Sequence, residues 1–561
     1  MKKWKIQNES GIKNNESWDK FLKILLENRG VKTKKEIEEF LHPKLDEVTA
    51  KSVGIDQEQL KKAIVRINKA IEKKEKIVVF GDYDVDGICG TAILWETLNS
   101  IGANVMPYIP HRIDEGYGLS AKALESKDFK VHNPTLVITV DNGIVANEAV
   151  EFANKQGIDV IITDHHVPSK KLPKAYAIVH TTKLCGTSVA YLLAQEIKKK
   201  GNDSSRQART IPDDHLALVA LATVADLVPL TSSNRTLLVH GLKSLRETKR
   251  PGIVALCQEA GIDQKNIGTY EIGHVIAPRL NAMGRLEYAM ESLRLLCTID
   301  KNRAKLLADK LGSTNKERQT LTIETVQHAK EKVKSQKSKV KSLLFIADES
   351  YQQGVIGLVA GRLVEEFYRP SIVVSKGEVY SKASARSVHG FNIIEFIRSA
   401  SKYLVDAGGH PMAAGFTVET AKLVLLQETL EKKAEELLSE EMLTRSLRVD
   451  CELRLPMIDE KLYSEVQMLA PFGMGNPEPT FMSRNVVTDD MRLVGKDSKH
   501  VRFRFMMYDL RFTIDGIGFG LGEKSAELHV GDTVDIVYTI DENVWNGNKN
   551  LQLKVKDIKA S

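Results

Sequence analysis

The sequence predicts an α/β protein of several domains that ends in a small β-barrel. Three observations support this fold class. The chain has 561 residues, which at roughly 150 residues per domain corresponds to about three or four units. Short apolar runs alternate with helical patterns between residues 76 and 180, as in a parallel sheet covered by helices. After residue 447 the pattern changes to short strands separated by turns, which is typical of a barrel.

The first α/β region contains five apolar runs that we expect to be strands. They are KIVVF ending at residue 80, NVMPYI beginning at 104, TLVITV ending at 140, DVIIT ending at 163 and AIVH ending at 180. Helical patterns lie between them, for example at residues 88–98 and 145–156. We expect residues 1–70 to form an N-terminal helical segment and residues 71–298 to form the first and larger α/β domain.

A long helical pattern at residues 299–341 is expected to connect this domain to the next. Its end, KEKVKSQKSKVK from residue 330, carries six lysines, which form either a solvated helix face or a contact with a nucleic-acid backbone. Residues 342–442 show a second, smaller α/β pattern with the runs SLLFIA and SIVV, the helical GVIGLVAGRLVEEF and the glycine-rich GGHPMAAGF. The expected barrel occupies residues 443–561.

Composition sets limits on location and partners. The 80 basic and 74 acidic residues leave a net charge of +6, too small to prove a polyanionic partner. The five cysteines are scattered and nowhere spaced as a metal knuckle or a disulfide framework. The chain begins without an apolar segment of signal-peptide length, and it lacks 18 consecutive apolar residues. We therefore expect a soluble cytoplasmic protein that does not contact membranes.

Three carboxylates follow the first expected strand in the segment GDYDVDG. Alternate side chains of an extended segment share one side, so Asp82, Asp84 and Asp86 can converge where this strand ends. A helix-loop-helix calcium site is excluded, because no helix precedes the segment and its twelfth position is Ile93 instead of Glu. The remaining alternative is a turn with solvated acids.

Further acids and two histidines stand at equivalent places. Asp141 follows one strand, His165 and His166 follow another, and Asp226 ends an apolar helical run. Open α/β sheets bind their ligands at the carboxyl ends of the strands. Two like charges about 4 Å apart repel by roughly 4 kcal/mol at an effective dielectric of about 20, so cations must compensate. Oxygen and imidazole ligands without thiolate favour two Mn²⁺ or Mg²⁺ ions, with no preference between them.

A pair of ions held by a bridging carboxylate activates water and stabilises a leaving oxygen in phosphoryl transfer. Asp141, on the expected central strand, is the candidate bridge. His165 and His166 are adjacent, so an extended backbone would point them to opposite sides. We expect one to bind metal and the other to contact phosphate or orient a ligand.

Several arginines beside small or polar residues suit phosphate binding, although a structural ion pair is an equal alternative for each. The candidates are Arg112, Arg279, Arg285 and Arg386, together with their polar neighbours Asn281 and Ser384. Gly408 and Gly409 allow close approach of a chain beside His410, or form a plain tight turn. In the barrel, Arg502 to Phe505 alternate cations with aromatic rings, which serve either as stacking surfaces for unpaired bases or as barrel core.

With these residues located, the chain resembles the bacterial RecJ single-strand-specific exonucleases of the DHH phosphoesterase family. The resemblance covers residues 50–561. It depends on an ordered set of motifs: GDYDVDG, PHRIDEGYGL, TVDNGI, TDHH, LATVADLVPL, APRLNAMGR, GVIGLVAGRL, SARS, GGHPMAAGF and PFGMGNPEP. It implies a DHH catalytic domain, a DHH-associated domain and a C-terminal OB-fold, with single-stranded DNA threading between the first two.

The resemblance also implies roles for individual residues. Asp84, Asp86, Asp141, His165 and Asp226 would bind two Mn²⁺ or Mg²⁺ ions, with Asp82 and His166 in or beside the ligand set. Arg279, Ser384 and Arg386 would hold the 5′-terminal phosphate, and His410 would lie near the scissile group. The implied activity is hydrolysis of single-stranded DNA from the 5′ end to 5′-mononucleotides in DNA repair and recombination.

The resemblance also implies a RecQ-type helicase and a single-stranded-DNA-binding protein as partners. We expect the protein to be a monomer. Two rival functions remain open at the level of sequence. A related phosphoesterase could cleave short RNA or cyclic dinucleotides, and a protein of this fold could be a non-catalytic replication scaffold.

Overall fold

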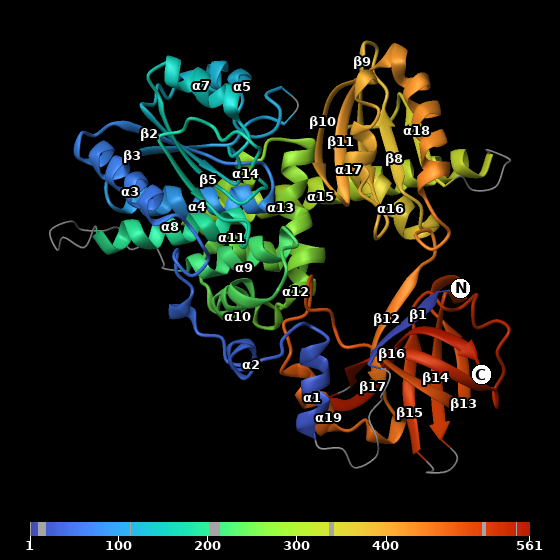
Figure 1. Cartoon of the computed structure of the whole chain (residues 1–561). Coiled ribbons are helices and arrows are strands. Elements are labelled where there is room, and N and C mark those ends of the chain that lie inside the picture. The colour runs from blue at the N-terminus through green and yellow to red at the C-terminus, as the bar shows by residue number, and fades with distance from the viewer. Residues whose placement is uncertain are drawn as a thin grey trace.

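Three domains make up the computed structural model, which describes residues 2–8, 18–112, 114–200, 214–335, 342–507, 512–545 and 547–561. Figure 1 shows the first domain at the upper left, the second at the upper right and the barrel at the lower right. The long helix α15 (Lys301–Ser335) links the first two domains. None of the described helices combines the length and apolar composition needed to cross a bilayer.

The first domain is built on a five-stranded parallel sheet, as predicted. Its order is β3-β2-β4-β5-β6, so the chain reverses direction across the sheet at β2. The strands are β2 (Lys76–Phe80), β3 (Asn104–Tyr108), β4 (Leu136–Val140), β5 (Asp159–Asp164) and β6 (Ala177–His180). Strand β4 is buried along its whole length because both faces of the sheet are covered, which explains the continuous apolar runs.

Helices cover both faces of this sheet. Helix α4 is buried for most of its length because it packs against α8, α9 and α14. The helices of this region are α3 (Gln57–Glu72), α4 (Val85–Ser100), α5 (Ala121–Glu125), α6 (Lys127–Lys130), α7 (Asn147–Lys155), α8 (Gly186–Lys200), α9 (His215–Ala225), α10 (Ser232–Glu247), α11 (Pro251–Ala260), α12 (Thr269–Glu271), α13 (Ala277–Leu286) and α14 (Met290–Cys297).

The predicted connector is helical through Ser335, where the described part of α15 ends. It packs on α11 and α13 of the first domain and on α16 and β7 of the second. Lys330 contacts Glu366 and Lys332 contacts Asp348, so these two lysines form ion pairs within the protein. Lys337, Lys339 and Lys341, for which a solvated helix face and a nucleic-acid contact were the two alternatives, lie outside the described residues.

The second domain has a mixed five-stranded sheet in the order β10-β11-β9-β8-β7. Its strands are β7 (Leu344–Asp348), β8 (Ser371–Ser375), β9 (Tyr380–Arg386), β10 (Leu404–His410) and β11 (Ala413–Glu419). Its helices are α16 (Ile356–Phe367), α17 (Ile393–Arg398) and α18 (Leu423–Leu437). The glycine-rich GGHPMAAGF is the β10–β11 hairpin, in which Gly408 pairs with Gly415.

The third domain contains the predicted closed barrel. Strand β13 pairs with both β14 and β16, which closes the ring β13-β14-β15-β17-β16. The strands are β12 (Ser446–Glu452), β13 (Phe481–Val494), β14 (His500–Met507), β15 (Phe512–Gly518), β16 (Thr533–Trp545) and β17 (Asn548–Ala560), with helix α19 (Glu460–Gln467). Phe503 and Phe505 are buried in the core, whereas Arg502 and Arg504 are exposed and pair with Asp515.

The expectation of an entirely helical N-terminal segment is wrong for residues 3–8. Strand β1 (Lys3–Asn8) pairs in parallel with β12 at the edge of the barrel sheet. Its alternation of half-buried and exposed residues suits a strand, and Trp4 and Ile6 pack beside Val449. Helices α1 (Trp18–Glu27) and α2 (Lys34–Leu41) follow, and Phe21 of α1 belongs to the barrel core. The N-terminal and C-terminal strands therefore lie in one domain (Figure 1).

Candidate active site

Three of the predicted carboxylates lie around the start of α4. Asp84 is the N-cap of this helix, and its side chain accepts hydrogen bonds from the backbone amides of Asp86 and Gly87 at 3.0 and 3.1 Å. Asp86 lies in the first helical turn, so the extended geometry that the sequence predicted for the segment is wrong. Gly87 permits the tight bend, because a Cβ there would lie 2.6 Å from the backbone of Asp82.

Asp86 is held by the amino end of another helix. Its two carboxylate oxygens accept hydrogen bonds from the backbone amides of Gly186 and Thr187, both at 2.7 Å. Both residues stand at the beginning of α8, where helical amides lack partners within the helix. This anchoring fixes the carboxylate on the side of the site that faces α9.

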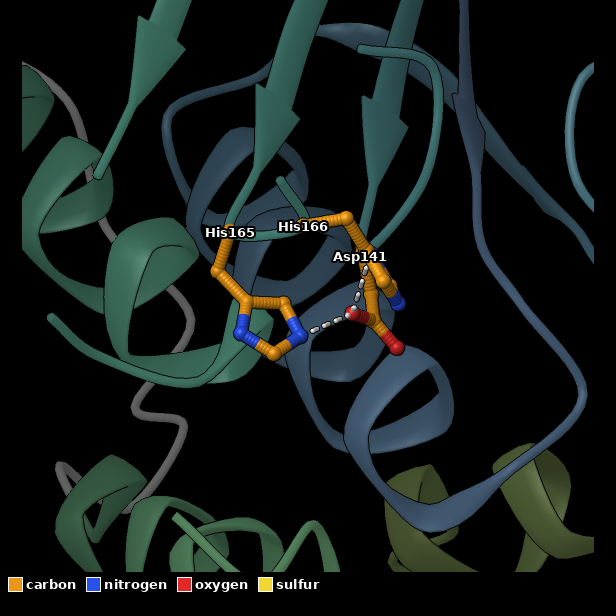
Figure 2. A group of neighbouring side chains, drawn as sticks. All are labelled: Asp141, His165 and His166. Atoms are coloured by element: carbon orange, nitrogen blue, oxygen red, sulfur yellow. Dashed lines mark ion pairs between the residues drawn. The ribbon is translucent and has the colours of Figure 1, made fainter. Parts of the chain in front are cut away.

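Asp141 occupies the centre of the site. It follows β4 with a φ of 62°, it is 2% exposed, and its Oδ1 lies 3.1 Å from Nε2 of His165. Nδ1 of His166 lies 3.9 Å from the same oxygen, and Figure 2 shows both imidazoles turned toward Asp141. The expectation that adjacent histidines would point to opposite sides is therefore wrong, because the backbone beyond Asp164 is no longer a strand.

Asp164 orients the second histidine. Its Oδ1 lies 2.8 Å from Nδ1 of His166, and its Oδ2 accepts a hydrogen bond from the amide of Ile144 at 2.8 Å. Burial alone would raise the pKa of Asp164, but the contacts from His166 and the backbone amides outweigh it and lower that pKa. An ionised Asp164 accepts a hydrogen bond from Nδ1 of His166, and Nε2 of the same ring lies 3.4 Å from the hydroxyl of Tyr117.

Asp226 completes the cluster from the end of α9. It caps this helix, and its Oδ2 lies 3.6 Å from Nε2 of His165, which is also 3.8 Å from Asp86. Three overlapping groups of ligand atoms result, each with all atoms within 4.8 Å of one another. They are Asp82 with Asp84 and Asp141, Asp86 with His165 and Asp226, and Asp141 with His165 and His166.

The electrostatics of this cluster are those of a cation site. Burial, followed by repulsion from neighbouring carboxylates, raises the pKa of Asp82 and Asp141, and it raises that of Asp226 to about 9. Burial lowers the pKa of His165. Oδ1 of Asp82, Oδ1 of Asp141, Nε2 of His165 and Oδ2 of Asp226 are buried without a hydrogen-bond partner among the described residues. Divalent cations would satisfy these atoms, and the oxygen and imidazole donors fit Mn²⁺ or Mg²⁺.

A cavity of about 610 Å³ opens from the carboxylates into the space between the first two domains. Residues of both domains line it, among them Asp82, Asp84, Arg112, Asn281, Arg285, Gly357, Ser384 and Arg386. Among the described residues, Arg112, Arg285 and Arg386 form no ion pair with a carboxylate. Burial, followed by the charge of Arg112 and other arginines, lowers the pKa of Arg285 to about 10. This uncompensated positive charge suits a phosphate group.

Of the other predicted residues, Asn281 and Gly409 line this cavity, whereas, among the described residues, Arg279, Gly408 and His410 are absent from its lining. Asn281 accepts a hydrogen bond from the amide of Val85 at 3.0 Å, at the start of α4. His410 reaches across from β10 and stacks on His166, with ring centroids 5.9 Å apart. Arg279 instead points away and pairs with Glu259 at 2.6 Å, so it is absent from the cavity lining that the described residues form.

Two contributors were missed at the level of sequence. Tyr117 lies beside His166, and only its place in the glycine-flanked EGYG could have suggested it. Gly357 begins α16, and a Cβ there would lie 3.0 Å from Ser384 Oγ and 3.3 Å from Arg386 Nη2. No local signal marks Gly357, because its proximity to β9 arises from packing of α16 on the sheet.

Comparisons with known proteins identify the family of this chain. The DHH family N-terminal domain matches residues 76–223, the DHHA1 domain residues 337–439 and the RecJ OB domain residues 449–557. The single-stranded-DNA-specific exonuclease RecJ of Escherichia coli (strain K12) is 31% identical over 96% of this chain and 95% of its own length. The chain belongs to the RecJ family. RecJ of Bacillus subtilis (strain 168) is 36% identical over 96% of this chain and 67% of its own length.

Two crystal structures of one RecJ match the fold over the whole chain. RecJ of Thermus thermophilus in complex with Mn²⁺ superposes with a TM-score of 0.82 at 27% identity, covering 100% of this chain and 80% of that one. The Mg²⁺ complex of the same protein gives a TM-score of 0.76 at 26% identity, with coverages of 100% and 78%. The predicted fold class and the resemblance to RecJ are thus confirmed.

Proposed function

We propose that the chain is a single-stranded-DNA-specific exonuclease that degrades DNA from the 5′ end and releases 5′-mononucleotides. One observation carries this proposal: the buried cluster of carboxylates and imidazoles opens into a cavity lined by arginines. Such a site binds a phosphate next to a place where water can be activated. The names of the RecJ relatives support the choice of single-stranded DNA as substrate.

Two divalent cations, Mn²⁺ or Mg²⁺, would be held by residues that come from four different elements. We assign Asp82, Asp84, Asp86, Asp141, His165 and Asp226 to this ligand set. When bound, such ions lower the pKa of a water molecule and stabilise charge on the leaving oxygen. Asp141 belongs to two of the three groups of ligand atoms, which supports the proposal that its carboxylate bridges.

The arginine side of the cavity would bind the 5′-terminal phosphate. We assign Arg386, Ser384 and Arg285 to phosphate binding, in place of the predicted Arg279, because Arg279 forms an ion pair with Glu259. Arg386 and Ser384 lie on β9 next to the first turn of α16, where helical amides favour an anion. Arg112 adds charge from the first domain, with its guanidinium 4.8 Å from the ring centre of Tyr83.

Two histidines would contact the reacting phosphate. Asp164 accepts a hydrogen bond from Nδ1 of His166, and Nε2, on the side of Tyr117, would contact a phosphate oxygen. His410, on the hairpin of the second domain, stacks on His166 and can donate a hydrogen bond to a phosphate oxygen. Gly408 and Gly409 beside it allow a nucleic-acid chain to approach the edge strand β10.

A nuclease assay on labelled strands tests the proposal. The protein should degrade a 5′-labelled single strand in Mn²⁺, release mononucleotides, and spare a blunt duplex of the same sequence. A length series separates this function from its closest rival, since an enzyme for short RNA or cyclic dinucleotides would prefer dinucleotides to a long strand. Binding of DNA without turnover in either metal would instead indicate a non-catalytic scaffold.

We further propose that the protein acts in DNA repair and recombination in the cytoplasm, as a monomer. The five cysteines are all free, four of them buried, as suits a reducing compartment. A RecQ-type helicase would supply single strands, and a single-stranded-DNA-binding protein would keep them open. Light scattering tests the monomer, and stimulation of degradation of a duplex by added helicase tests the first partner.

A further inference from the structure

The PFGMGNPEP motif of the third domain lies against the first domain. The carbonyl oxygen of Met474 accepts a hydrogen bond from the amide of Leu230 at 2.7 Å. The carbonyl oxygen of Phe472 accepts one from the hydroxyl of Thr269 at 2.8 Å. We call residues 469–477 the interdomain loop. Figure 1 shows this orange segment rising from the barrel toward α10 and α12.

Hydrogen bonds from side chains stabilise the backbone of the interdomain loop. Asn476 is 0% exposed, and its Nδ2 donates to the carbonyl oxygens of Leu469 and Pro471 at 2.8 and 3.0 Å. Its Oδ1 accepts a hydrogen bond from Nε of Arg29 at 2.9 Å, and Arg29 also donates to the carbonyl oxygen of Pro477 at 2.7 Å. Both the donor and the acceptor of this buried amide are therefore satisfied, which stabilises the loop in the observed conformation.

A buried arginine of the first domain ties the loop to α10. Arg235 is 3% exposed and donates to the carbonyl oxygens of Leu469 at 2.9 Å and Ala470 at 2.8 Å. Burial lowers its pKa to about 10, so the carbonyl contacts must compensate for lost hydration. The loop is therefore fixed at the start of α10, immediately after the segment that carries Asp226.

The segment from Asp226 to Leu230 depends on this support. Leu227 has a φ of 59°, which is unfavourable for a leucine, and its side chain is 63% exposed. Such a backbone persists only where its surroundings determine it. Leu230 is buried, and the interdomain loop accepts the hydrogen bond of its amide four residues beyond the carboxylate. The position of Asp226 is thus set from both sides, by α9 and by the third domain.

We propose that the interdomain loop positions Asp226 for cation binding with Asp86 and His165, and that Gly475 is the positioning residue that makes this possible. Gly475 has a φ of 73°, and a Cβ there would lie 2.9 Å from Cβ and 3.1 Å from Cα of Pro229. Only glycine lets the two backbones approach so closely. This inference rests on the proposed cation site and adds a role for the third domain in building it.

Manganese titration of the protein without DNA tests the proposal, with bound ions counted by electron paramagnetic resonance. Gly475→Ala should weaken one of two Mn²⁺ sites about tenfold and leave the other unchanged, because Asp82, Asp84 and Asp141 do not contact the loop. Gly520→Ala is the matched control. Gly520 has a φ of 70° in the same domain, and a Cβ at this position would have nothing within 4 Å, so the variant carries the same backbone strain without the contact.

A second variant covers the case in which Gly475→Ala does not fold. Thr269→Val removes the hydrogen bond to Phe472 from the first domain and should weaken the same site about threefold. Unchanged affinities in the folded variants would overturn the proposal. So would an equal loss at both sites, or the same loss in Gly520→Ala, since either indicates general destabilisation. A wild-type protein that binds no Mn²⁺ would instead overturn the proposed function itself.

Discussion

Asp141→Asn is expected to make the metal-free protein more stable while abolishing its nuclease activity. The substitution removes one negative charge from the centre of the carboxylate cluster and keeps the shape of the side chain. Asparagine also tolerates the φ of 62° at this position. Any change in stability therefore reports on charge and metal binding, and the backbone contributes little to it.

The magnitude follows from the distances in the cluster. The ligand atoms of Asp82, Asp84 and Asp141 lie within 4.8 Å of one another. At an effective dielectric of about 20, two unit charges at that separation repel by about 3.5 kcal/mol. Protonation relieves part of this repulsion, because burial raises the pKa of Asp141. We expect the free energy of unfolding to rise by about 2 kcal/mol, or about 4–8 °C in the midpoint of the first domain.

Two measurements on the same preparations test this reasoning. Thermal unfolding in EDTA at pH 7.5 should show the variant above the wild type, and saturating Mn²⁺ should reverse that order by stabilising mainly the wild type. Degradation of a 5′-phosphorylated single strand should fall at least about a thousandfold, or roughly 4 kcal/mol. A variant that is less stable than the wild type in EDTA, or that keeps the wild-type rate in Mn²⁺, would refute the assignment of Asp141.

Three further outcomes are expected. Arg386→Ala should slow degradation of a 5′-phosphorylated strand about 10- to 100-fold and that of a 5′-hydroxyl strand little, with Arg279→Ala as the unaffected control; equal losses on both ends would contradict a terminal phosphate site. Buried Arg250 pairs with buried Glu96 and Asp214, both at 2.6 Å, so Arg250→Met should lower the free energy of unfolding in urea by about 3–5 kcal/mol by leaving these carboxylates without this cation; a loss below about 1 kcal/mol would show that the ion pairs are dispensable. In EDTA, the free energy of unfolding should fall from pH 5.5 to 8.5. The folded-state pKa of Asp226 is about 9 and the unfolded value is about 3.9, so in this range the folded protein binds a proton that the unfolded chain has released. Asp226→Asn should flatten that slope, and an unchanged slope would assign it to other groups.

Much of the fold could be predicted because its signals are local. The central strands of the first sheet, β2, β4 and β5, are almost entirely buried, so each appears as a continuous apolar run of the right length. Phe503 and Phe505 alternate with Arg502 and Arg504, and a strand separates such residues onto two faces. The placement of Asp141 at a carboxyl edge followed from topology alone.

Details that depend on contacts between distant segments could not be predicted. The pairing of β1 with β12 joins residues more than 400 positions apart, and a six-residue strand says nothing of its partner. Arg279 and Arg285 both lie on α13, and only the packing of the second domain decides which one lines the cavity. The two histidines converge because the chain bends after Asp164.

The sequence by itself determined the order of the domains, the chemical nature of the ligands and the sheet edge on which they gather, because periodicity, residue type and strand direction are properties of short stretches of chain. Tertiary structure decided how these side chains are oriented and which residues they contact. The support of Asp226 by the interdomain loop, the arginines that remain without a carboxylate and the closeness of His410 to His166 all arise where separate domains meet. Such contacts depend on packing between surfaces, and no local pattern encodes them.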